Sequence, residues 1–459
     1  MYQIDFQRPI SIYFCGIGGI SMSGLAEILL TEGFQIMGSD IKKSSLTQSL
    51  EEKGATVYYG QRASNLASVP ALFVYTAAVH MDNPEMEEAL RLKIPTMSRA
   101  DLLGQIMKNY DIPIAISGTH GKTTTTSMIS EILMKANLDP TLSIGGILNS
   151  IKGNIRIGQS DIFVTEACEY TNSFLSFFPK IGVILNIEED HLDFFKDLAQ
   201  IRDSFHKFAL LLPADGTLII NGTISHYEEI TKDLVCNVIT YGNHSSFDYS
   251  ATDITYDNLA RPSYTLQKNG ISLETILLGV PGEHNVYNSL AAIALSDLLT
   301  VSREDAKTAL LGFTGTNRRF EKKGTIGGIT IIDDYAHHPT EITATLKAAK
   351  KYPHKTTWCV FQPHTYTRTK AFMDDFAKAL ALADRVVLAD IYPARETDNL
   401  GINSQVLQEK IQNLGTICDY FPSFDEIENF LLENCINGDL LITMGAGDVV
   451  EIGESLLGI

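Results

Sequence analysis

The chain has 459 residues, of which 44% are hydrophobic and 20% charged, with 34 glycines and 15 prolines. This composition is typical of a folded globular protein and excludes a disordered chain, and the length predicts about three domains. The 36 basic and 55 acidic residues leave a net charge of -19. Nucleic acid is therefore an unfavourable partner, because its phosphate backbone is also anionic.

Membrane and secretory signals are not evident in the sequence. No run reaches the roughly 18 apolar residues of a membrane span, and the N-terminal MYQIDFQRP carries an acid where a signal peptide is basic. The cysteines form no CxxC pair, which argues against a disulfide framework or a zinc site; they are Cys15, Cys168, Cys236, Cys359, Cys418 and Cys435. We expect a cytoplasmic protein without a membrane span, either a monomer or a weak homodimer.

Residues 1–101 alternate short apolar runs with helical patterns. Strands are predicted at 11–15, 34–40, 55–60 and 71–79, with helices over 22–31 and from Pro84 onward. This alternation predicts an α/β fold with a parallel sheet and right-handed crossovers.

Residues 102–314 and 315–459 form two further α/β segments. In the second, 113–117, 161–166 and 180–187 are predicted strands, and 124–136 and 285–300 are predicted helices. Short alternating pieces between about 215 and 280 suggest an antiparallel β insertion. In the third, strands are expected at 329–335, 357–362, 385–391 and 439–445, separated by helices.

A glycine-rich loop, SGTHGKTT, lies between a predicted strand and a predicted helix of the second segment. Such a loop brings backbone N–H groups and a helix N-terminus to phosphate oxygens, with Lys122 reaching the β- and γ-phosphates and Thr123 bound to Mg²⁺. Ile116 replaces the first glycine of the strict pattern, so the loop is a shorter variant. The nucleotide-binding residues are Gly118, Thr119, His120, Gly121, Lys122, Thr123 and Thr124.

Glu166 ends one of the other predicted strands of this segment, and His191 follows another. Because ligands collect at the carboxyl ends of parallel strands, both are expected to converge on Lys122 and Thr123. A carboxylate and a hydroxyl suit Mg²⁺, whereas an imidazole is a softer ligand, and a structural histidine is the alternative. The predicted metal ligands are Thr123, Glu166 and His191.

The first segment opens with a second glycine-rich loop, GIGGIS. It resembles a dinucleotide fingerprint in which Asp40 is placed for a ribose hydroxyl, although Ser21 replaces the last glycine. The alternatives are a plain tight turn and a ligand that contains a pyrophosphate, such as NAD(P) or a nucleotide-sugar.

Polar clusters follow three predicted strands of the third segment: 334–339, 364–368 and 392–396. Two contain an arginine, which suits carboxylate and phosphate geometry, and Arg318 and Arg319 at the start of the segment add positive charge. Together these clusters indicate a site rather than a solvated surface.

The chain resembles the ATP-dependent Mur ligases of peptidoglycan synthesis. GTHGKTTTT, EACE, NIEEDHLD, GEHNVYN, NRRFEKKG, DDYAHHPTEI and FQPHTYTRT resemble the motifs of that family, in order, over nearly the whole chain. The opening IYFCGIGGISMSGLAEILL and His120 are similar to the branch that joins L-alanine to UDP-N-acetylmuramate.

The resemblance implies a Rossmann-like N-terminal domain (1–101), a central P-loop ATPase domain with a mainly parallel sheet (102–314) and a Rossmann-like C-terminal domain (315–459). It implies ATP and Mg²⁺, with Mn²⁺ as a substitute, and UDP-N-acetylmuramate and L-alanine as substrates. For ATP it adds His284, Asn285, Asn288 and Arg319. For the UDP-substrate the residues are Gly16, Gly18, Gly19, Ile20, Ser21, Asp40 and Arg99. For the amino-acid side they are Tyr335, His337, His364 and Arg368.

The implied reaction converts a carboxylate into an acyl phosphate, which the amine of L-alanine then attacks, giving ADP and phosphate. The expected catalytic residues are Lys122, Glu166, His191, His337 and Arg368, with His191 and His337 as alternative proton acceptors. Sister ligases use a carbamylated lysine where this chain has Ser204-Phe205-His206, so no modified lysine is expected. The alternatives are a recycling ligase that adds a tripeptide to the same sugar, a nucleotide sensor without ligase activity, and a dehydrogenase. We further expect Arg99, Arg319 and Arg368 to face one cleft.

Overall fold

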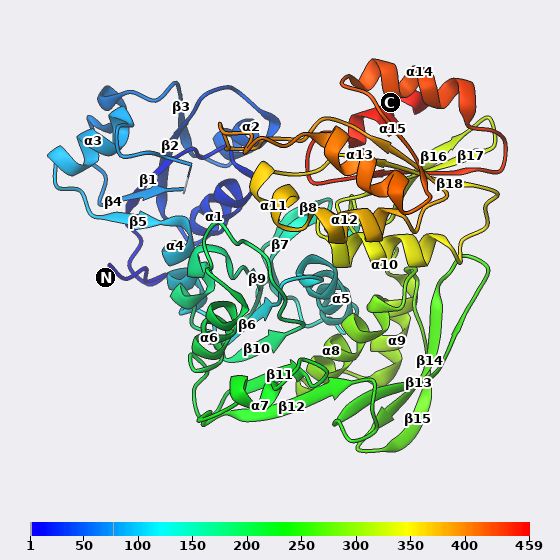
Figure 1. Ribbon diagram of the computed structural model, residues 1–459. Helices are drawn as coiled ribbons and strands as arrows, with labels where there is room; N and C mark the ends of the chain where they lie inside the picture. The colour runs from blue at the N-terminus through cyan, green and yellow to red at the C-terminus, as the bar shows by residue number, and fades with distance from the viewer. Residues whose placement is uncertain (1, 77) are drawn as a thin grey trace.

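The computed structural model describes residues 2–76 and 78–459, which form three β-sheets with flanking helices (Figure 1). The first sheet has the order β3-β2-β1-β4-β5, and every pairing in it is parallel. Its strands are β1 (Ser11–Cys15), β2 (Gln35–Asp40), β3 (Thr56–Tyr59), β4 (Leu72–Tyr75) and β5 (Thr96–Ser98). Its helices are α1 (Ile20–Thr31), α2 (Ser45–Glu52), η1 (Ala63–Leu66), α3 (Pro84–Arg91) and α4 (Arg99–Met107).

The central sheet is the largest and has the order β15-β14-β13-β12-β11-β10-β6-β9-β7-β8. Its strands are β6 (Ile112–Ser117), β7 (Thr141–Leu148), β8 (Gly153–Arg156), β9 (Ile162–Ala167), β10 (Ile181–Ile184), β11 (Thr217–Asn221), β12 (Asn237–Gly242), β13 (Tyr249–Tyr256), β14 (Pro262–Lys268) and β15 (Ile271–Leu277). Its helices are α5 (Lys122–Lys135), η2 (Asn149–Ile151), η3 (Tyr170–Ser176), α6 (Leu198–Ala209), α7 (Tyr227–Ile230), α8 (His284–Leu298) and α9 (Arg303–Gly312).

The expected antiparallel insertion is correct only in part. β11 pairs in parallel with β10 and with β12, so the parallel sheet continues through residues 217–242. Within residues 215–280, the antiparallel pairings are those of β13 with β14 and of β14 with β15, and these strands extend the same sheet instead of forming a separate one. The pattern of β11 does not reveal this continuity, because a short buried strand has the same apolar run whether its neighbours are parallel or antiparallel.

The third sheet has the order β16-β17-β21-β18-β19-β20. All its pairings are parallel except that of the edge strand β16. Its strands are β16 (Glu321–Ile326), β17 (Ile329–Asp334), β18 (Thr357–Phe361), β19 (Arg385–Leu388), β20 (Ile417–Tyr420) and β21 (Leu440–Met444). Its helices are α10 (Pro339–Ala349), α11 (Tyr366–Ala371), α12 (Met373–Leu380), α13 (Ser404–Asn413), α14 (Phe424–Asn434) and α15 (Val450–Leu457).

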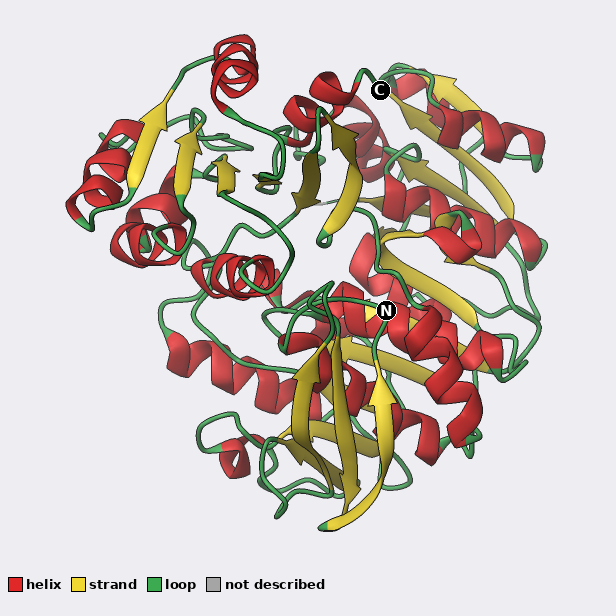
Figure 2. Ribbon diagram, turned by 90° about the vertical axis from the view of Figure 1, so that its right-hand side faces the viewer, coloured by secondary structure: helices red, strands yellow, loops and turns green. Residues whose placement is uncertain are grey.

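The sheets are arranged so that the first and third both adjoin the central one, as Figures 1 and 2 show from two directions. Helices α10 and α11 lie at the boundary between the third sheet and the central one (Figure 1). Among the described residues, no helix is both long and apolar enough to cross a membrane.

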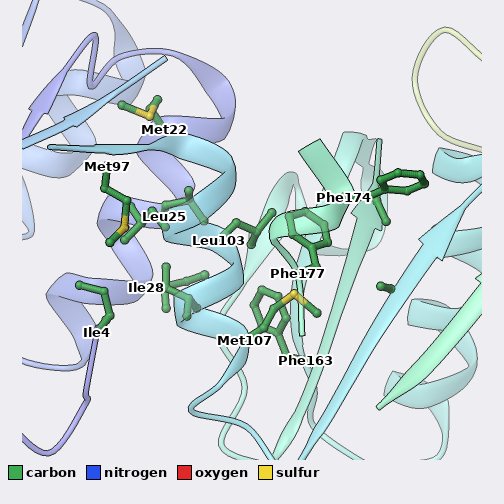
Figure 3. Close-up of a cluster of buried hydrophobic side chains, with 14 of the residues drawn as sticks. Ile4, Met22, Leu25, Ile28, Met97, Leu103, Met107, Phe163, Phe174 and Phe177 are labelled. Carbon is green, nitrogen blue, oxygen red and sulfur yellow. The ribbon is translucent and has the colours of Figure 1, made fainter. Parts of the chain in front are cut away.

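One hydrophobic core is shared by the first and central sheets. It joins side chains of α1 and α4, including Met22, Leu25 and Leu103, to Phe163 of β9 and Phe174 of η3 (Figure 3). Both core clusters around the third sheet are instead formed by residues between 320 and 457.

Candidate functional site

The phosphate loop lies between β6 and α5, as predicted, and the backbone conformation of its glycines shapes it. Gly118 has a φ of 144° and Gly121 a φ of 83°, values that residues with a Cβ rarely adopt. Asn186, after β10, fixes the loop by accepting from His120 N at 2.7 Å through its side chain and from Thr119 N through its carbonyl. Helix α5 begins at Lys122, so its positive dipole end faces the loop.

Lys122 is largely but not fully buried, with its side chain 16% exposed, and directs its ammonium group back over this loop. The Nζ donates to the carbonyls of Gly118 and Thr119 and to Glu169 Oε2 at 2.9 Å. Burial by itself would lower the pKa of Lys122, but the negative charge of Glu169 outweighs it and raises that pKa. The lysine is therefore charged at neutral pH.

Thr123, Glu166 and His191 converge beside Lys122, as expected from the strand ends. Glu166 Oε2 accepts from the Thr123 hydroxyl at 3.1 Å, and its Oε1 accepts from Gly145 N at 2.6 Å. Burial raises the pKa of Glu166. His191 Nε2 lies 3.8 Å from a carboxylate oxygen of Glu169.

This donor set fits a divalent cation. It offers a hydroxyl and a carboxylate oxygen, which Mg²⁺ prefers, and one imidazole nitrogen. Glu169 Oε1 is buried and has no hydrogen-bond partner within residues 2–76 and 78–459. Its carboxylate therefore adds negative charge next to His191, one of these three residues. The residues that would hold the cation are Thr123, Glu166 and His191.

The residues expected on the adenosine side of ATP line one cavity of 160 Å³ on the other flank of the loop. Asn285 donates to the carbonyl of Pro281 at 2.7 Å, and Asn288 donates to Asn285 Oδ1 at 3.0 Å, so both amides are oriented. Burial lowers the pKa of His284 to about 4, which keeps the ring neutral. The predicted residues in this lining are His120, Gly121, Thr124, His284, Asn285, Asn288 and Arg319.

Residues of the third sheet face the phosphate loop across a cavity of 490 Å³. Tyr335 and His337 line it together with Lys122, Glu166 and His191. Because the Tyr335 carbonyl lies 3.0 Å from His337 Nδ1, that nitrogen carries the proton and Nε2 is the one able to accept another. Burial lowers the pKa of His337 to about 4.

His364 and Arg368 line an adjoining cavity of 370 Å³. Arg368 donates to Asp190 Oδ1 from Nε at 3.1 Å and from Nη2 at 3.0 Å. Burial alone would raise the pKa of Asp190, but Arg368 outweighs it and holds that pKa far below its usual range. Asp190 and His191 border both cavities, so the two spaces meet there.

The first glycine-rich loop connects β1 to α1. Gly16 has a φ of 83°, which favours glycine, and a Cβ at Gly18 would lie 2.7 Å from Asp40 Oδ2, so a larger residue there would have to move the Asp40 side chain. Asp40 accepts from Gly18 N at 2.8 Å and from Ile41 N at 2.7 Å. The acid thus stabilises the loop itself, and its contact with a ribose stays a prediction.

After this loop, α1 begins at Ile20, beside the cavity that contains the phosphate loop. Gly19 is its N-cap, and Ile20, 57% exposed, lines the 490 Å³ cavity and a further cavity of 310 Å³. Arg99 lines the latter and donates to Ser21 Oγ at 3.1 Å. The first sheet therefore contributes one wall beside Glu166, which borders both spaces.

The three arginines expected in one cleft lie in adjoining cavities. Arg99 lines the 310 Å³ cavity, Arg319 the 490 Å³ one and Arg368 the 370 Å³ one. These spaces meet at Glu166 and at His191, so the arginines surround one continuous region.

Arg318 differs from Arg319 in its bonding. It donates to Asp333 at 3.0 Å and to the carbonyls of Gly445 and Gly447, so its guanidinium fastens the third sheet. We therefore do not assign Arg318 to the nucleotide.

Several acids that the sequence reasoning did not select border the site. Glu188 and Glu341 each lie 3.4 Å from a ring nitrogen of His120, and together they outweigh its burial and raise its pKa to about 9. Asp190 and Glu169 contact Arg368 and Lys122. These acids lie within the sequence motifs quoted above, so the motifs could have identified them as candidate site residues. Only the structure shows which basic residue each of them contacts.

The Ser204 region lies apart from these contacts. The Ser204 hydroxyl donates to Asn172, and His206 Nδ1 lies 3.0 Å from the Ile230 carbonyl.

Comparisons with known proteins cover nearly the whole chain. Family models match residues 11–111 (Mur ligase family, catalytic domain), 116–296 (Mur ligase middle domain) and 318–447 (Mur ligase, glutamate ligase domain). The chain is 60% identical to a UDP-N-acetylmuramate–L-alanine ligase of Lachnospira eligens, over 100% of both chains.

Two solved structures are also similar to this chain. A UDP-N-acetylmuramate-alanine ligase of Thermotoga maritima is 29% identical, with a TM-score of 0.82 over 98% of each chain. A murein peptide ligase of Psychrobacter arcticus is 26% identical, with a TM-score of 0.70 over 98% of each chain.

Proposed function

This chain belongs to the Mur ligase family, and on that premise we propose that it joins L-alanine to UDP-N-acetylmuramate, at the expense of ATP, in peptidoglycan precursor synthesis. The observation that carries the proposal is the 490 Å³ cavity, in which the phosphate-loop Lys122 faces His337 of the third sheet. A phosphoryl donor and an acceptor can meet there, with Ile20 of the first sheet forming part of the wall.

ATP is assigned to the phosphate loop and the adjoining 160 Å³ cavity. In this assignment the loop N–H groups and Lys122 would bind the phosphates, and His284, Asn285 and Asn288, which line that cavity, would contact the adenosine side. Arg319 lines both cavities, so it is placed beside the phosphates.

The carboxylate of UDP-N-acetylmuramate is a poor electrophile until it is phosphorylated. Lys122 neutralises charge as the γ-phosphoryl moves to that carboxylate and forms an acyl phosphate. Mg²⁺, held by Thr123, Glu166 and His191, supplies further positive charge at the transferring group when bound. The sugar nucleotide extends from here to the loop at Gly16–Ser21 and to Arg99.

L-alanine is assigned to the third-sheet side, where Arg368 and His364 lie next to His191. The amine attacks the acyl phosphate as a neutral group, the tetrahedral intermediate collapses, and phosphate leaves. We assign the proton-accepting role to His337, because its Nε2 is unprotonated and the residue lines the cavity. His191 faces Glu169 and Asp190 and is assigned to the metal.

The recycling ligase that adds a tripeptide to the same sugar is the alternative reaction. Phosphate release is measured with ATP, Mg²⁺ and UDP-N-acetylmuramate, adding L-alanine in one series and the tripeptide in another. We expect turnover with L-alanine and little without an amino acid. Preference for the tripeptide would replace the proposal with the recycling activity, and rapid turnover with ATP and Mg²⁺ alone would contradict both.

A further inference from the structure

Glu169 is a buried acid to which neither the sequence motifs nor the reaction scheme gives a role. It follows β9 by two residues and is 2% exposed. Burial of a carboxylate is costly unless charged or hydrogen-bonding partners compensate it. Its position at the carboxyl edge of the central sheet, where Glu166 also lies, indicates a function in the site.

Each oxygen of Glu169 faces a different functional side chain. Oε2 accepts from Lys122 Nζ at 2.9 Å, and Oε1 lies 3.8 Å from His191 Nε2. Oε1 is the atom that lacks a hydrogen-bond partner within the described part of the chain. The carboxylate therefore stands between the phosphate-binding lysine and the histidine assigned to the metal.

The hydrogen bonds of Lys122 show what Glu169 contributes at the phosphate loop. An ammonium group has three N–H donors, and here they serve Gly118 O, Thr119 O and Glu169 Oε2. A phosphate that approaches Lys122 must displace one of these acceptors. It also approaches the negative charge of Glu169, which opposes binding of ATP that carries no cation.

We propose that Glu169 is a positioning residue that holds Lys122 over the phosphate loop, and that its charge, close to Lys122 and His191, makes metal-free ATP bind weakly. Its charge favours the cation-bound nucleotide because a cation held at Glu166 and His191 offsets the repulsion. This inference rests on the proposed assignment of ATP to the Lys122 loop.

The experiment separates binding from turnover in the full-length protein. Glu169→Gln keeps the shape and one acceptor oxygen but removes the charge, and Glu189→Gln is the matched control on an exposed acid of the segment after β10. Calorimetry with ATP in EDTA measures metal-free binding, and phosphate release at saturating Mg²⁺ and substrates measures kcat. For Glu169→Gln we expect metal-free ATP to bind at least threefold tighter and kcat to fall at least tenfold.

A purely structural residue would not produce these two opposite changes. Wild-type values for both quantities in Glu169→Gln would overturn the proposal, and so would weaker metal-free binding. Glu169→Asp, which keeps the charge, is the second variant should Glu169→Gln fail to fold. It should show wild-type metal-free affinity with a reduced kcat, and tighter metal-free binding would overturn the proposal.

Lys122→Ala distinguishes failure of this inference from failure of the proposed function. If Lys122→Ala binds Mg·ATP as the wild type does, the assignment of ATP to this loop is wrong. If that variant loses Mg·ATP while Glu169→Gln matches the wild type, only the role of Glu169 is wrong.

Discussion

Lys122 lies where the phosphate loop meets helix α5, and the carboxylate of Glu169 favours its charged form in this partly buried position. We predict that Lys122→Ala lowers turnover at least a hundredfold, since loss of one preorganised charge at the transferring phosphoryl group costs about 3 kcal/mol or more. Phosphate release measures this loss. Binding of UDP-N-acetylmuramate, measured by calorimetry, should survive, because the residues assigned to it lie in the first sheet. Retention of most activity would refute the assignment of the loop.

His120 connects the phosphate loop to the third sheet by its charge. Its folded pKa of about 9 lies above the ordinary value of 6.5, so protonation contributes stability below about pH 6.5 that is lost as the pH rises through 9. We predict that wild type is more stable than His120→Gln by roughly 1 to 3 kcal/mol at pH 6, and that the difference disappears by about pH 10. Denaturant unfolding at several pH values measures it. A difference that does not depend on pH would contradict a charged His120.

The residues of the site differ in how far sequence can predict them. Lys122, Thr123, Glu166 and His191 could be predicted, because each lies at or after the carboxyl end of a strand, and these ends meet at one edge of a parallel sheet. Glu169, Asp190 and Glu341 could not, because in a chain of 55 Asp and Glu residues an acid becomes significant only through its partner. The partner of Glu169 is Lys122, 47 residues away in the sequence, and that of Asp190 is Arg368, 178 residues away. The partner of Glu341 is His120, more than 200 residues away.

Helix α4 packs against η3 of the central region through a glycine. A Cβ at Gly104 would lie 2.0 Å from the Ser176 carbonyl oxygen. The backbone of α4 or of η3 would have to move to relieve this clash. We predict that Gly104→Ala destabilises the protein by about 1 to 3 kcal/mol despite the higher helix propensity of alanine. Thermal or denaturant unfolding measures the change.

The matched control is Gly312→Ala at the end of α9, where an added Cβ meets nothing within 4 Å. Alanine there should be neutral or stabilising by up to about 1 kcal/mol. If both substitutions changed stability alike, close packing at Gly104 would not be the cause.

The strands show a similar division between what sequence can and cannot predict. Buried strands such as β6, β9 and β18 are continuous apolar runs and could be located from the pattern. β16 is a polar edge strand and β20 has only four residues, so neither has a clear signal. The direction of β11 depends on its pairing with β10, which periodicity does not report.

The two contacts of the central sheet differ in chemistry. Toward the first sheet it shares an apolar core with Leu25, Leu103 and Phe174 (Figure 3), whereas toward the third it offers charged and polar pairs. Those pairs include Arg368 with Asp190 and Thr340 with Glu188 at 2.6 Å. Polar interfaces between domains open more readily than apolar ones.

We predict that ATP and UDP-N-acetylmuramate together reduce the radius of gyration by drawing the third domain onto the central one, which small-angle scattering measures. An unchanged radius with full activity would indicate a site assembled before the substrates bind.

The same asymmetry predicts which part of the chain folds without the rest. Cutting at the proposed boundary after residue 314 separates mostly polar contacts, so residues 1–314 should unfold cooperatively and still bind UDP-N-acetylmuramate. They should form no product, because the wall containing His337 and Arg368 is gone. Cutting after residue 111, between α4 and β6, instead exposes the shared core, so residues 112–459 should aggregate or lose a cooperative transition. Circular dichroism and calorimetry of the two fragments test this. Equal stability of both fragments would show that the apolar interface does not hold the first two sheets together.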